Sequence, residues 1–149
     1  MFVCHGNICR SPMAECLMAH LLLQKNMTHI SIASCATSTE ELGNPIYPPA
    51  REELLRHNIP LRPHRARQAC PADLDQYDLF LCAESINIHN LARAAGPAAL
   101  DKTCRLLDLT NHPRDIADPW WTGDFTLTWC DLQEGCHALL EKLLQAHNR

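Results

Sequence analysis

Aromatic side chains are scarce in this chain of 149 residues, where phenylalanine, tryptophan and tyrosine together make up 5%. Glycine is also rare, with five residues, which excludes collagen-like and glycine-rich linker compositions. No apolar run approaches the roughly 20 residues that a membrane-spanning helix needs. The start of the chain lacks the basic segment and the long apolar segment of a secretory signal. We therefore expect a cytoplasmic protein that does not insert into a membrane.

Charge of one sign is not in large excess either. The formal net charge of −4 gives no general attraction to nucleic acid, so we expect no nucleic-acid partner. An apolar fraction of 46% and a charged fraction of 20% fit a globular protein. The length is usual for one domain with a sizeable core, and we expect a single domain over residues 1–149.

Cysteine, in contrast, is abundant, with nine residues. A disulfide framework is disfavoured, because the chain has no export signal and is large enough to build a core. Zinc is disfavoured because the nearest candidate ligands, Cys130 and Cys136, fall on nearly opposite faces of a helix. We therefore expect no metal and no cofactor. Most cysteines are expected to be small buried residues, namely Cys16, Cys35, Cys70, Cys104, Cys130 and Cys136.

Apolar patterning alternates between strands and helices along the chain. Short apolar runs predict strands over 1–3, 30–36, 77–82 and 104–109. Apolar residues three and four apart predict helices over 12–26, 50–58, 84–95 and 124–146, with a further helical turn over 71–74. This order predicts an α/β fold, a three-layer αβα sandwich with a four-stranded parallel sheet. The active site of such a sheet lies at the carboxyl ends of its strands.

The segment after the first predicted strand has the residue types of a phosphate-binding loop. Cys4 and Arg10 are separated by five residues, and Ser11 precedes a helix that begins near Pro12. A loop of this length can direct successive backbone N–H groups at one phosphoryl group, and the helix N-terminus adds partial positive charge. Arg10 offers a planar fork to two phosphoryl oxygens. The predicted phosphate-binding residues are His5, Gly6, Asn7, Ile8, Cys9 and Arg10.

Two residues are expected to shape the backbone of this loop. Gly6 permits conformations closed to other residues, and Asn7 tolerates left-handed geometry and can tie the loop with side-chain hydrogen bonds. A helix N-terminus and an adjacent cation favour the ionised sulfur of a cysteine. We therefore expect Cys4 to be a thiolate that attacks phosphorus and forms a phosphocysteine. Ser11 can donate a hydrogen bond to the sulfur as it leaves in the second step.

A nucleophile of this kind needs a proton donor for the leaving group. Asp118, followed by Pro119, lies in the connection after the fourth predicted strand, and hence near the same edge of the sheet. Trp120 and Trp121 come next and can form an apolar wall for an aromatic ring. We expect Asp118 to be the general acid and the two tryptophans to be the substrate wall.

Residues 4–12 read Cys-His-Gly-Asn-Ile-Cys-Arg-Ser-Pro, and segments 34–38, 64–68 and 82–87 and the Asp118-Pro119 pair follow in order. Through these segments, which are spread over nearly its whole length, the chain resembles the low-molecular-weight protein tyrosine phosphatase family. The resemblance implies a flavodoxin-like arrangement of four parallel strands. It also implies Cys4 as nucleophile, Arg10 as transition-state clamp and Asp118 as general acid and then general base. The residues implied to support the loop are Asn7, Ser11 and His64.

The resemblance also implies what the protein acts on. The substrate class is a phosphotyrosine-containing protein, with aryl phosphates hydrolysed as well. Phosphate or another oxyanion is expected in the active site, and we expect a monomer. Cys9 is typical of the family and suggests redox control, since two thiols in one tight loop can pair under peroxide. The alternative is that Cys9 only packs behind the loop.

Several positions depart from the family pattern. The first strand is normally longer, whereas only three residues precede Cys4 here. Trp120 and Trp121 stand in place of the usual tyrosine pair. The loop that commonly carries a wall aromatic has Glu40 and Glu41 instead, and an acidic rim there would disfavour acidic phosphopeptides. Two further departures are His5, for which we expect a neutral role, and the turn that begins at Tyr47.

Two other functions remain open at this point. An arsenate reductase uses the same loop but needs two further cysteines to shuttle a disulfide. Cys82 lies near the expected place of the first, while Ile88, His89 and Asn90 occupy the region of the second. A non-catalytic phosphate-binding module would need neither the nucleophile nor the acid.

Overall fold

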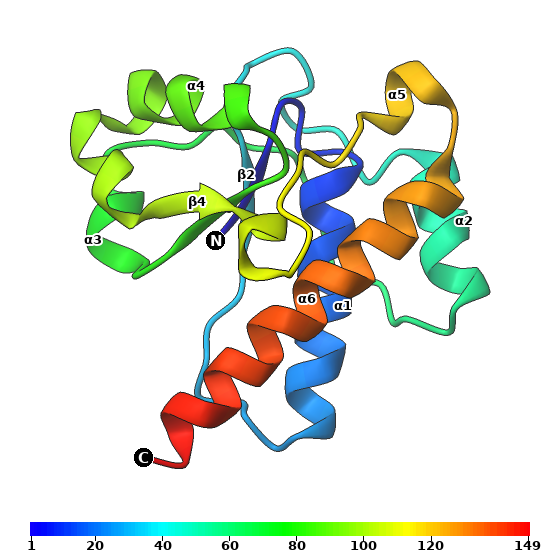
Figure 1. Ribbon diagram of the computed structural model, residues 1–149. Coiled ribbons are helices and arrows are strands. Elements are labelled where there is room, and N and C mark those ends of the chain that lie inside the picture. The colour runs from blue at the N-terminus through cyan, green and yellow to red at the C-terminus, as the bar shows by residue number, and fades with distance from the viewer.

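Four short parallel strands form one sheet in the order β2-β1-β3-β4. The structure is a computed structural model that describes residues 1–149 (Figure 1). Its strands are β1 (Phe2–Cys4), β2 (Ser34–Ala36), β3 (Phe80–Cys82) and β4 (Thr103–Arg105). The predicted α/β fold with a four-stranded parallel sheet is confirmed. The predicted strand over 77–82 and that over 30–36 are each shortened to their last three residues.

Helices cover both faces of the sheet (Figure 1). On one face lie α1 (Arg10–Gln24), α2 (Pro48–Arg56) and α6 (Phe125–His147). There α1 packs on β1 and β2, and α6 and α2 pack on α1. On the other face lie α3 (Asp73–Gln76), α4 (Ser85–Ala95) and the 3₁₀ helix η1 (Pro97–Lys102). The result is the three-layer sandwich that the sequence predicts.

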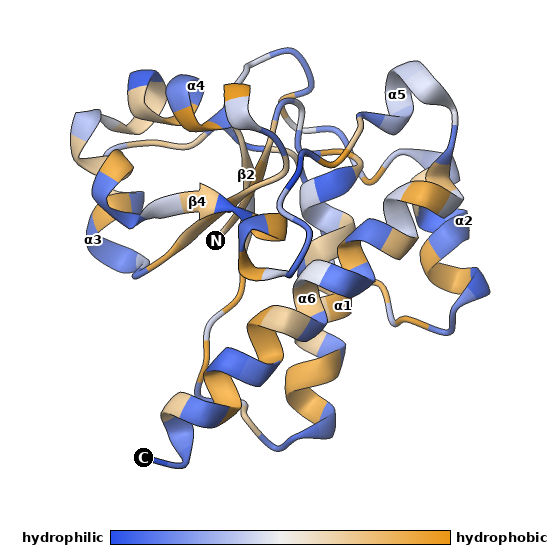
Figure 2. Cartoon of the chain, viewed as in Figure 1, coloured by the Kyte–Doolittle hydropathy of each residue, from blue (hydrophilic) through white to orange (hydrophobic).

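The strands send alternate side chains to the two faces, because successive Cβ atoms of a strand point in opposite directions. A large apolar cluster beneath α1 and α6 receives Phe2, Cys4, Leu81 and Ala83. A smaller cluster beneath α4 receives Met1, Val3, Phe80 and Cys82. Figure 2 shows these strands in apolar colours between helices with polar outer faces. This double burial explains why the strands read as continuous apolar runs rather than alternating ones.

The short first strand nevertheless lies in the centre of the sheet. β1 pairs with β2 on one side and β3 on the other, and Leu81 and Ala83 donate backbone N–H groups to Met1 and Val3, each at 2.9 Å. Pairing on both sides and burial on both faces hold a strand of three residues in place. Its last residue is Cys4, which therefore begins the loop at the carboxyl edge of the sheet.

The prediction of a strand over 104–109 is wrong in its second half. β4 ends at Arg105, and a 3₁₀ helix, η2 (Leu106–Leu109), follows. The Asp108 carboxylate accepts the backbone N–H of Arg105 at 2.8 Å and hydrogen bonds from its guanidinium. These hydrogen bonds close a turn that ends the strand. The apolar run of Leu106 and Leu107 alone suggests that the strand continues.

All nine cysteines are free. Cys16, Cys35 and Cys136 are buried as predicted, and Cys104 is half-buried. Cys70 and Cys130 are exposed, so the prediction of burial is wrong for these two. Cys70 lies in the turn before α3, and Cys130 lies on the exposed side of α6. None of the helices is both long enough and apolar enough to cross a membrane.

Candidate active site

The loop between β1 and α1 forms the floor of a cavity of about 750 Å³. Every residue of the predicted phosphate-binding loop lines it, from Cys4 through Arg10. The rest of the lining comes from segments that are far apart in the sequence, namely Glu40, Glu41, Glu84, Asp118, Trp120, Trp121 and Thr122. The carboxyl edge of the sheet therefore brings the predicted nucleophile, acid and aromatic wall together at one site.

The Cys4 sulfur lies at the N-terminal end of α1 and contacts Ser11. Its Sγ atom is 2.9 Å from the Ser11 hydroxyl oxygen, and the backbone N–H of Asn7 donates to the same sulfur at 3.3 Å. The Asn7 amide group donates to the Ser11 oxygen at 2.8 Å, and the Ser11 hydroxyl has two acceptors within reach, the Cys4 sulfur and, at 3.5 Å, the Cys35 backbone oxygen. The Asn7 N–H and the Ser11 hydroxyl thus both lie within hydrogen-bond distance of the sulfur.

Asn7 holds the loop together from a fully buried position. Its amide nitrogen donates to Ser11 and, at 2.9 Å, to Ser34 at the start of β2. Its side-chain oxygen accepts the backbone N–H of Arg67 at 3.1 Å. Both N–H groups and the oxygen of the buried amide thus have partners, as a buried polar group requires.

Asn7, and not Gly6, supplies the left-handed backbone of the loop. Asn7 has φ of 59°, in the region that asparagine tolerates better than most residues, whereas Gly6 is absent from the residues with positive φ. The expectation that Gly6 provides special backbone freedom is therefore wrong. A Cβ atom at Gly6 would lie 3.4 Å from Cγ of Glu41, a contact with a flexible side chain.

His64 supports the loop from behind, as the family pattern implies. Its Nε2 atom is 2.6 Å from the backbone oxygen of Asn7. A carbonyl oxygen only accepts hydrogen bonds, so the Nε2 atom carries the hydrogen. The side chain is half-buried, in the extended segment between α2 and α3. This bond satisfies the carbonyl of the one loop residue in left-handed conformation.

Arg10 crosses the floor of the cavity with a side chain that is 2% exposed. Its Nη1 atom donates to the backbone oxygen of Ile116 at 2.8 Å and lies 3.1 Å from the Glu84 carboxylate. Its Nη2 atom lies 3.3 Å from the Asp118 carboxylate. Burial acts to lower the pKa of Arg10, but the nearby charges of Cys4, Asp118 and Glu84 outweigh it and raise the pKa above its ordinary value. The guanidinium is thus a permanent cation.

Asp118 lies at the N-terminus of the short helix α5 (Pro119–Thr122). Its Oδ1 atom accepts the backbone N–H of Trp120 at 3.1 Å, while its Oδ2 atom faces Arg10. Trp120 and Trp121 are 50% and 82% exposed and line the cavity mouth. Thus the turn presents one carboxylate and two indole rings to whatever enters the cavity.

A family model described as low molecular weight phosphotyrosine protein phosphatase matches residues 1–149. Among curated proteins, the chain is 34% identical over 146 residues to the low molecular weight protein-tyrosine-phosphatase YfkJ of Bacillus subtilis, covering 96% of this chain and 94% of that protein. It is also 34% identical over 151 residues to the human low molecular weight phosphotyrosine protein phosphatase, covering 95% and 93% of the two chains. The chain belongs to the low molecular weight protein tyrosine phosphatase family.

Solved structures of this phosphatase family share the fold. The crystal structure of YfkJ from Bacillus subtilis superimposes with a TM-score of 0.92 at 34% identity, covering 97% of this chain and 93% of that one. A structure of Wzb from Vibrio vulnificus in complex with benzylphosphonate has a TM-score of 0.84 at 28% identity, with 95% of each chain covered. The predicted family, its fold and its class of enzyme, a protein tyrosine phosphatase, are thereby confirmed.

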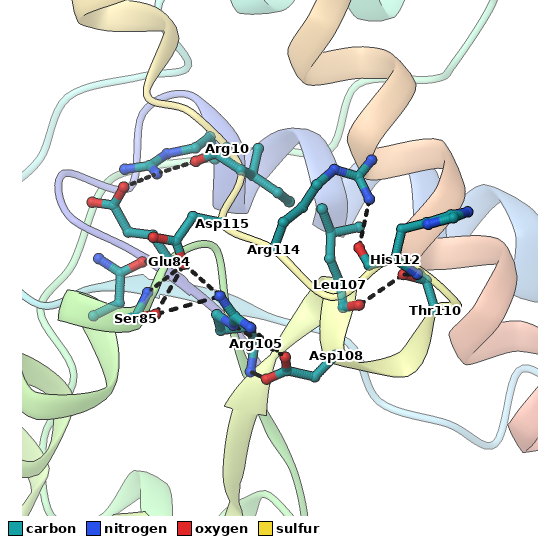
Figure 3. A network of polar contacts seen from close by, with 12 residues as sticks. Arg10, Glu84, Ser85, Arg105, Leu107, Asp108, Thr110, His112, Arg114 and Asp115 are labelled. Atoms are coloured by element: carbon teal, nitrogen blue, oxygen red, sulfur yellow. Dashed lines mark hydrogen bonds and ion pairs between the residues drawn. The ribbon is translucent and has the colours of Figure 1, made fainter.

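The structure of this phosphatase adds a carboxylate that the sequence interpretation missed. Glu84 follows β3 and precedes α4, with its backbone N–H bonded to the Asn87 side chain at 2.9 Å. Figure 3 shows its carboxylate beside Arg10, at the end of a polar network around Ser85 and Arg105. A glutamate before a helix is common, so its sequence context gave no reason to select it. Its position after a strand, at the carboxyl edge, is the signal that points to it.

A buried polar chain behind the loop was also missed. The Ser34 hydroxyl oxygen accepts a hydrogen bond from the Asn7 amide. The same hydroxyl donates its hydrogen to Glu15 Oε1 at 2.9 Å. Glu15 lies on α1, and its other oxygen is 3.7 Å from Arg62. The chain connects the thiol site to the surface through Ser11, Asn7, Ser34 and Glu15. Serine and glutamate in a helix and a strand carry no special pattern, so only the fold reveals it.

The cavity mouth of the phosphatase has an acidic rim, where the sequence places it. Glu40 and Glu41 line the mouth, and Glu40 Oε2 lies 2.9 Å from His5 Nε2. Glu41 accepts a hydrogen bond from Asn44 at 2.6 Å. With Glu84 deeper in the cavity, these side chains put negative charge around a site that receives anions. Arg10 and the loop amides are the attractive groups at its floor.

The other thiols near the loop are buried. Cys9 is 5% exposed, and burial, helped by the negative charges at Cys4 and Asp118, raises the pKa of its thiol far above the ordinary value. Cys82 is fully buried and packs in the cluster beneath α4, on the opposite face of the sheet from Cys4. Burial likewise raises the pKa of Cys82. A thiol in this place is not positioned to attack an adduct on Cys4, so the arsenate reductase alternative is not favoured.

Proposed function

We propose that the chain hydrolyses phosphotyrosine in protein substrates through a phosphocysteine intermediate on Cys4. The observation that supports this most is the Cys4 sulfur at the floor of the cavity, 2.9 Å from the Ser11 hydroxyl and within a loop that ends at the buried Arg10. A phosphate-binding module would not need a sulfur at this place. Asp118, on the opposite wall, supplies the proton that a phosphatase needs.

In the first step the Cys4 thiolate attacks phosphorus opposite the ester oxygen. The S–P bond forms and the P–O bond of the leaving group breaks, while Asp118 gives its proton to the leaving phenoxide. Arg10 turns its fork from the carboxylates to two phosphoryl oxygens. The loop amides and the N-terminus of α1 stabilise the charge on the equatorial oxygens.

In the second step a water molecule attacks the phosphocysteine. Asp118, now a carboxylate, takes a proton from the water, the new P–O bond forms and the S–P bond breaks. The Ser11 hydroxyl donates its hydrogen bond to the departing sulfur, which leaves as a thiolate and restores the free enzyme. Asn7 keeps the Ser11 side chain beside the sulfur, because its amide donates a hydrogen bond to the Ser11 oxygen at 2.8 Å.

The shape of the cavity supports an aryl phosphate as substrate. Trp120 and Trp121 stand at its mouth, above a floor that accepts one phosphoryl group. Benzylphosphonate, the molecule in the Vibrio vulnificus Wzb complex, joins an aromatic ring to a phosphonate and resembles the phosphotyrosine side chain. We propose the same placement here, with the oxyanion in the loop and the ring beside the tryptophans.

Nine free thiols suit a reducing compartment, so we propose that the enzyme works in the cytoplasm. A catalytic thiolate is also kept active there by the reducing agents of that compartment. We further propose that it acts as a monomer, because residues of one chain, all at the same edge of the sheet, line the whole cavity.

The proposal is tested with Cys4→Ser, assayed on p-nitrophenyl phosphate and on a phosphotyrosine peptide. We expect turnover to disappear while binding of inorganic phosphate, measured by calorimetry, persists. Cys70→Ser, at an exposed cysteine outside the cavity, is the matched control and should keep wild-type activity. Turnover at the wild-type rate in Cys4→Ser would show that another group is the nucleophile.

A further inference from the structure

We infer that Tyr47 is a positioning residue that keeps the Asp118 turn over the phosphate-binding loop by holding Trp120. This inference rests on the proposed role of Asp118 as general acid. The Tyr47 and Trp120 rings lie with centroids 4.9 Å apart at an angle of 52°. Tyr47 itself does not line the cavity, so it acts on the reaction through Trp120.

The base of the acid-bearing segment is fixed by polar contacts. Asp115 accepts the backbone N–H and the hydroxyl of Ser85 at 2.9 and 3.0 Å, and Arg105 Nη1 at 3.0 Å (Figure 3). Ile116 is fully buried, donates its N–H to the Ala83 oxygen at 2.9 Å and accepts from Arg10. These bonds hold the chain up to residue 116 against α4, β4 and the cavity floor.

The tip of the segment has a different kind of support. From Asp118 to Thr122, the backbone hydrogen bonds stay within the turn, including those from Trp121 and Thr122 to the Asp118 oxygen. Three side chains connect the turn to the rest of the molecule: Asp118 forms an ion pair with Arg10 at 3.3 Å, the Trp120 ring contacts Tyr47, and Pro119 is buried. The first of these depends on charge, and the other two do not.

The charge-dependent contact weakens when the enzyme is ready to react. A bound phosphoryl group takes the Arg10 fork, and an acid that delivers a proton is neutral, so Asp118 in that state makes no ion pair with Arg10. The contact of Trp120 with Tyr47 involves no ionised group and persists. Together with the buried Pro119, it therefore keeps Asp118 near the leaving oxygen in the substrate complex, where the ion pair no longer does so.

Tyr47 is well placed for this because it is itself joined to the loop. Its backbone N–H donates to the Ile8 oxygen at 2.9 Å, and it caps α2 just before Pro48 and Pro49. Its ring also lies 6.1 Å from that of Phe125 at the start of α6 and packs against the main core. A half-buried aromatic ring on a rigid backbone thus connects the loop that binds phosphate with the turn that carries the acid.

The test compares substrates that need the acid to different degrees. Phenyl phosphate has a poor leaving group and depends on protonation, whereas p-nitrophenyl phosphate has a good one and depends on it little. The measured quantity is kcat/KM, which reports the step in which the leaving group departs. Tyr47→Leu, which keeps apolar bulk in the core, should lower kcat/KM for phenyl phosphate about three- to tenfold, the range of an aromatic pair, and for p-nitrophenyl phosphate less.

Tyr47→Phe keeps the ring and should restore the wild-type values for both substrates. Tyr77→Leu is the matched control: the Tyr77 ring packs edge-on against Phe80 beneath α4, away from the cavity, and its loss should change neither value. Equal losses on both substrates in Tyr47→Leu, or failure of Tyr47→Phe to restore them, would overturn the inference and indicate a purely structural residue. Tyr47→Ala serves as a second variant with the same two readouts.

Failure of the inference can be told apart from failure of the proposed function. If Asp118 is the acid, Asp118→Asn alone makes kcat/KM depend steeply on the leaving group, and adding Tyr47→Leu should steepen it no further. If Asp118→Asn hydrolyses phenyl phosphate as the wild type does, the acid assignment itself is wrong. If Asp118→Asn behaves as expected and Tyr47→Leu alone leaves the leaving-group dependence unchanged, only the role of Tyr47 is wrong.

Discussion

The Nη2 atom of Arg10 lies 3.3 Å from the Oδ2 atom of Asp118, so the proposed phosphate clamp and the proposed acid form one ion pair in the free enzyme. Glu84 holds the other side of the same guanidinium at 3.1 Å. A phosphoryl group that enters the loop competes with two carboxylates for Arg10. In the free site Arg10 therefore lies between two carboxylates, and a bound phosphoryl group replaces their contacts with the guanidinium.

The first prediction concerns the acid. Asp118→Asn removes the proton donor but keeps the side-chain size and the hydrogen bond from Trp120. We expect kcat/KM for phenyl phosphate to fall about 10²- to 10⁴-fold, the usual contribution of a general acid, with a much smaller loss for p-nitrophenyl phosphate. Stopped-time assays with both substrates measure this. Asp124→Asn, at the N-terminus of α6 outside the cavity, is the matched control, and similar losses on both substrates in Asp118→Asn would contradict the acid role.

The phosphate-binding loop was predictable because its determinants are local. Cys4, Asn7, Arg10 and Ser11 fall within eight residues, and each has a residue type that its task requires. Asp118 could be predicted because the order of strands and helices puts every connection after a strand at the same edge of the sheet. The same reasoning predicted that the strands are parallel and that both faces of the sheet are buried.

The rest of the site depends on contacts between ordinary residues from distant segments. Glu84, Ser34 and Glu15 become functional neighbours of the loop only when β1, β2 and β3 lie side by side. Likewise, the left-handed residue of the loop is Asn7 and not Gly6, because the hydrogen bonds of Asn7 from Arg67 and to Ser34 fix it there. The tertiary structure determines which residue takes each of these positions, and single-residue preferences do not predict it.

The second prediction concerns the charge of the substrate. The acidic rim should favour phosphotyrosine flanked by lysine over phosphotyrosine flanked by glutamate, by about two- to fivefold in kcat/KM at low salt, since exposed charge pairs contribute little each. In the double variant Glu40→Gln, Glu41→Gln this preference should shrink. Glu52→Gln, an exposed glutamate of α2 outside the cavity, is the control. A preference that is unchanged in the double variant would exclude the rim as its source.

The third prediction concerns stability in acid. Asp73 is buried and accepts two hydrogen bonds from Arg67, at 2.9 and 3.0 Å, and one from the backbone N–H of Cys70. Burial acts to raise the pKa of Asp73, but these bonds outweigh it and hold the pKa below its ordinary value of 3.8. The folded state therefore binds this proton less readily than the unfolded chain. Its stabilising effect is complete above pH 3.8 and is lost as the pH falls through the lower folded-state pKa.

Asp73→Asn should lower the free energy of unfolding at neutral pH by about 1.5–3 kcal/mol, the range for hydrogen bonds to charged groups. It should also make the loss of stability below pH 3.8 shallower than in the wild type. Urea titrations over a range of pH measure both effects. The neighbouring Asp75→Asn is the control, and an acid transition of equal steepness in Asp73→Asn and the wild type would contradict the assignment.

The fourth prediction concerns oxidation. Peroxide converts the Cys4 thiolate to a sulfenic acid, with formation of an S–O bond and loss of hydroxide. Cys9 can then attack the Cys4 sulfur, forming a disulfide and releasing water, which keeps the damage reversible by thiols. Its own raised pKa makes Cys9 a poor first target, so it acts second. Inactivation should thus be reversed by dithiothreitol in the wild type and in Cys70→Ser but not in Cys9→Ser, and equal recovery in Cys9→Ser would refute the pairing.

The proposed mechanism depends on the covalent intermediate, and trapping this intermediate is the most direct test of the mechanism. Enzyme mixed with radiolabelled phenyl phosphate and quenched in acid within one turnover should carry the label on the peptide that contains Cys4. Cys4→Ser should carry none, and Asp118→Asn should accumulate more label than the wild type when p-nitrophenyl phosphate is used, because water attack lacks its base. Label on any other residue, or none at all during active turnover, would contradict the phosphocysteine mechanism.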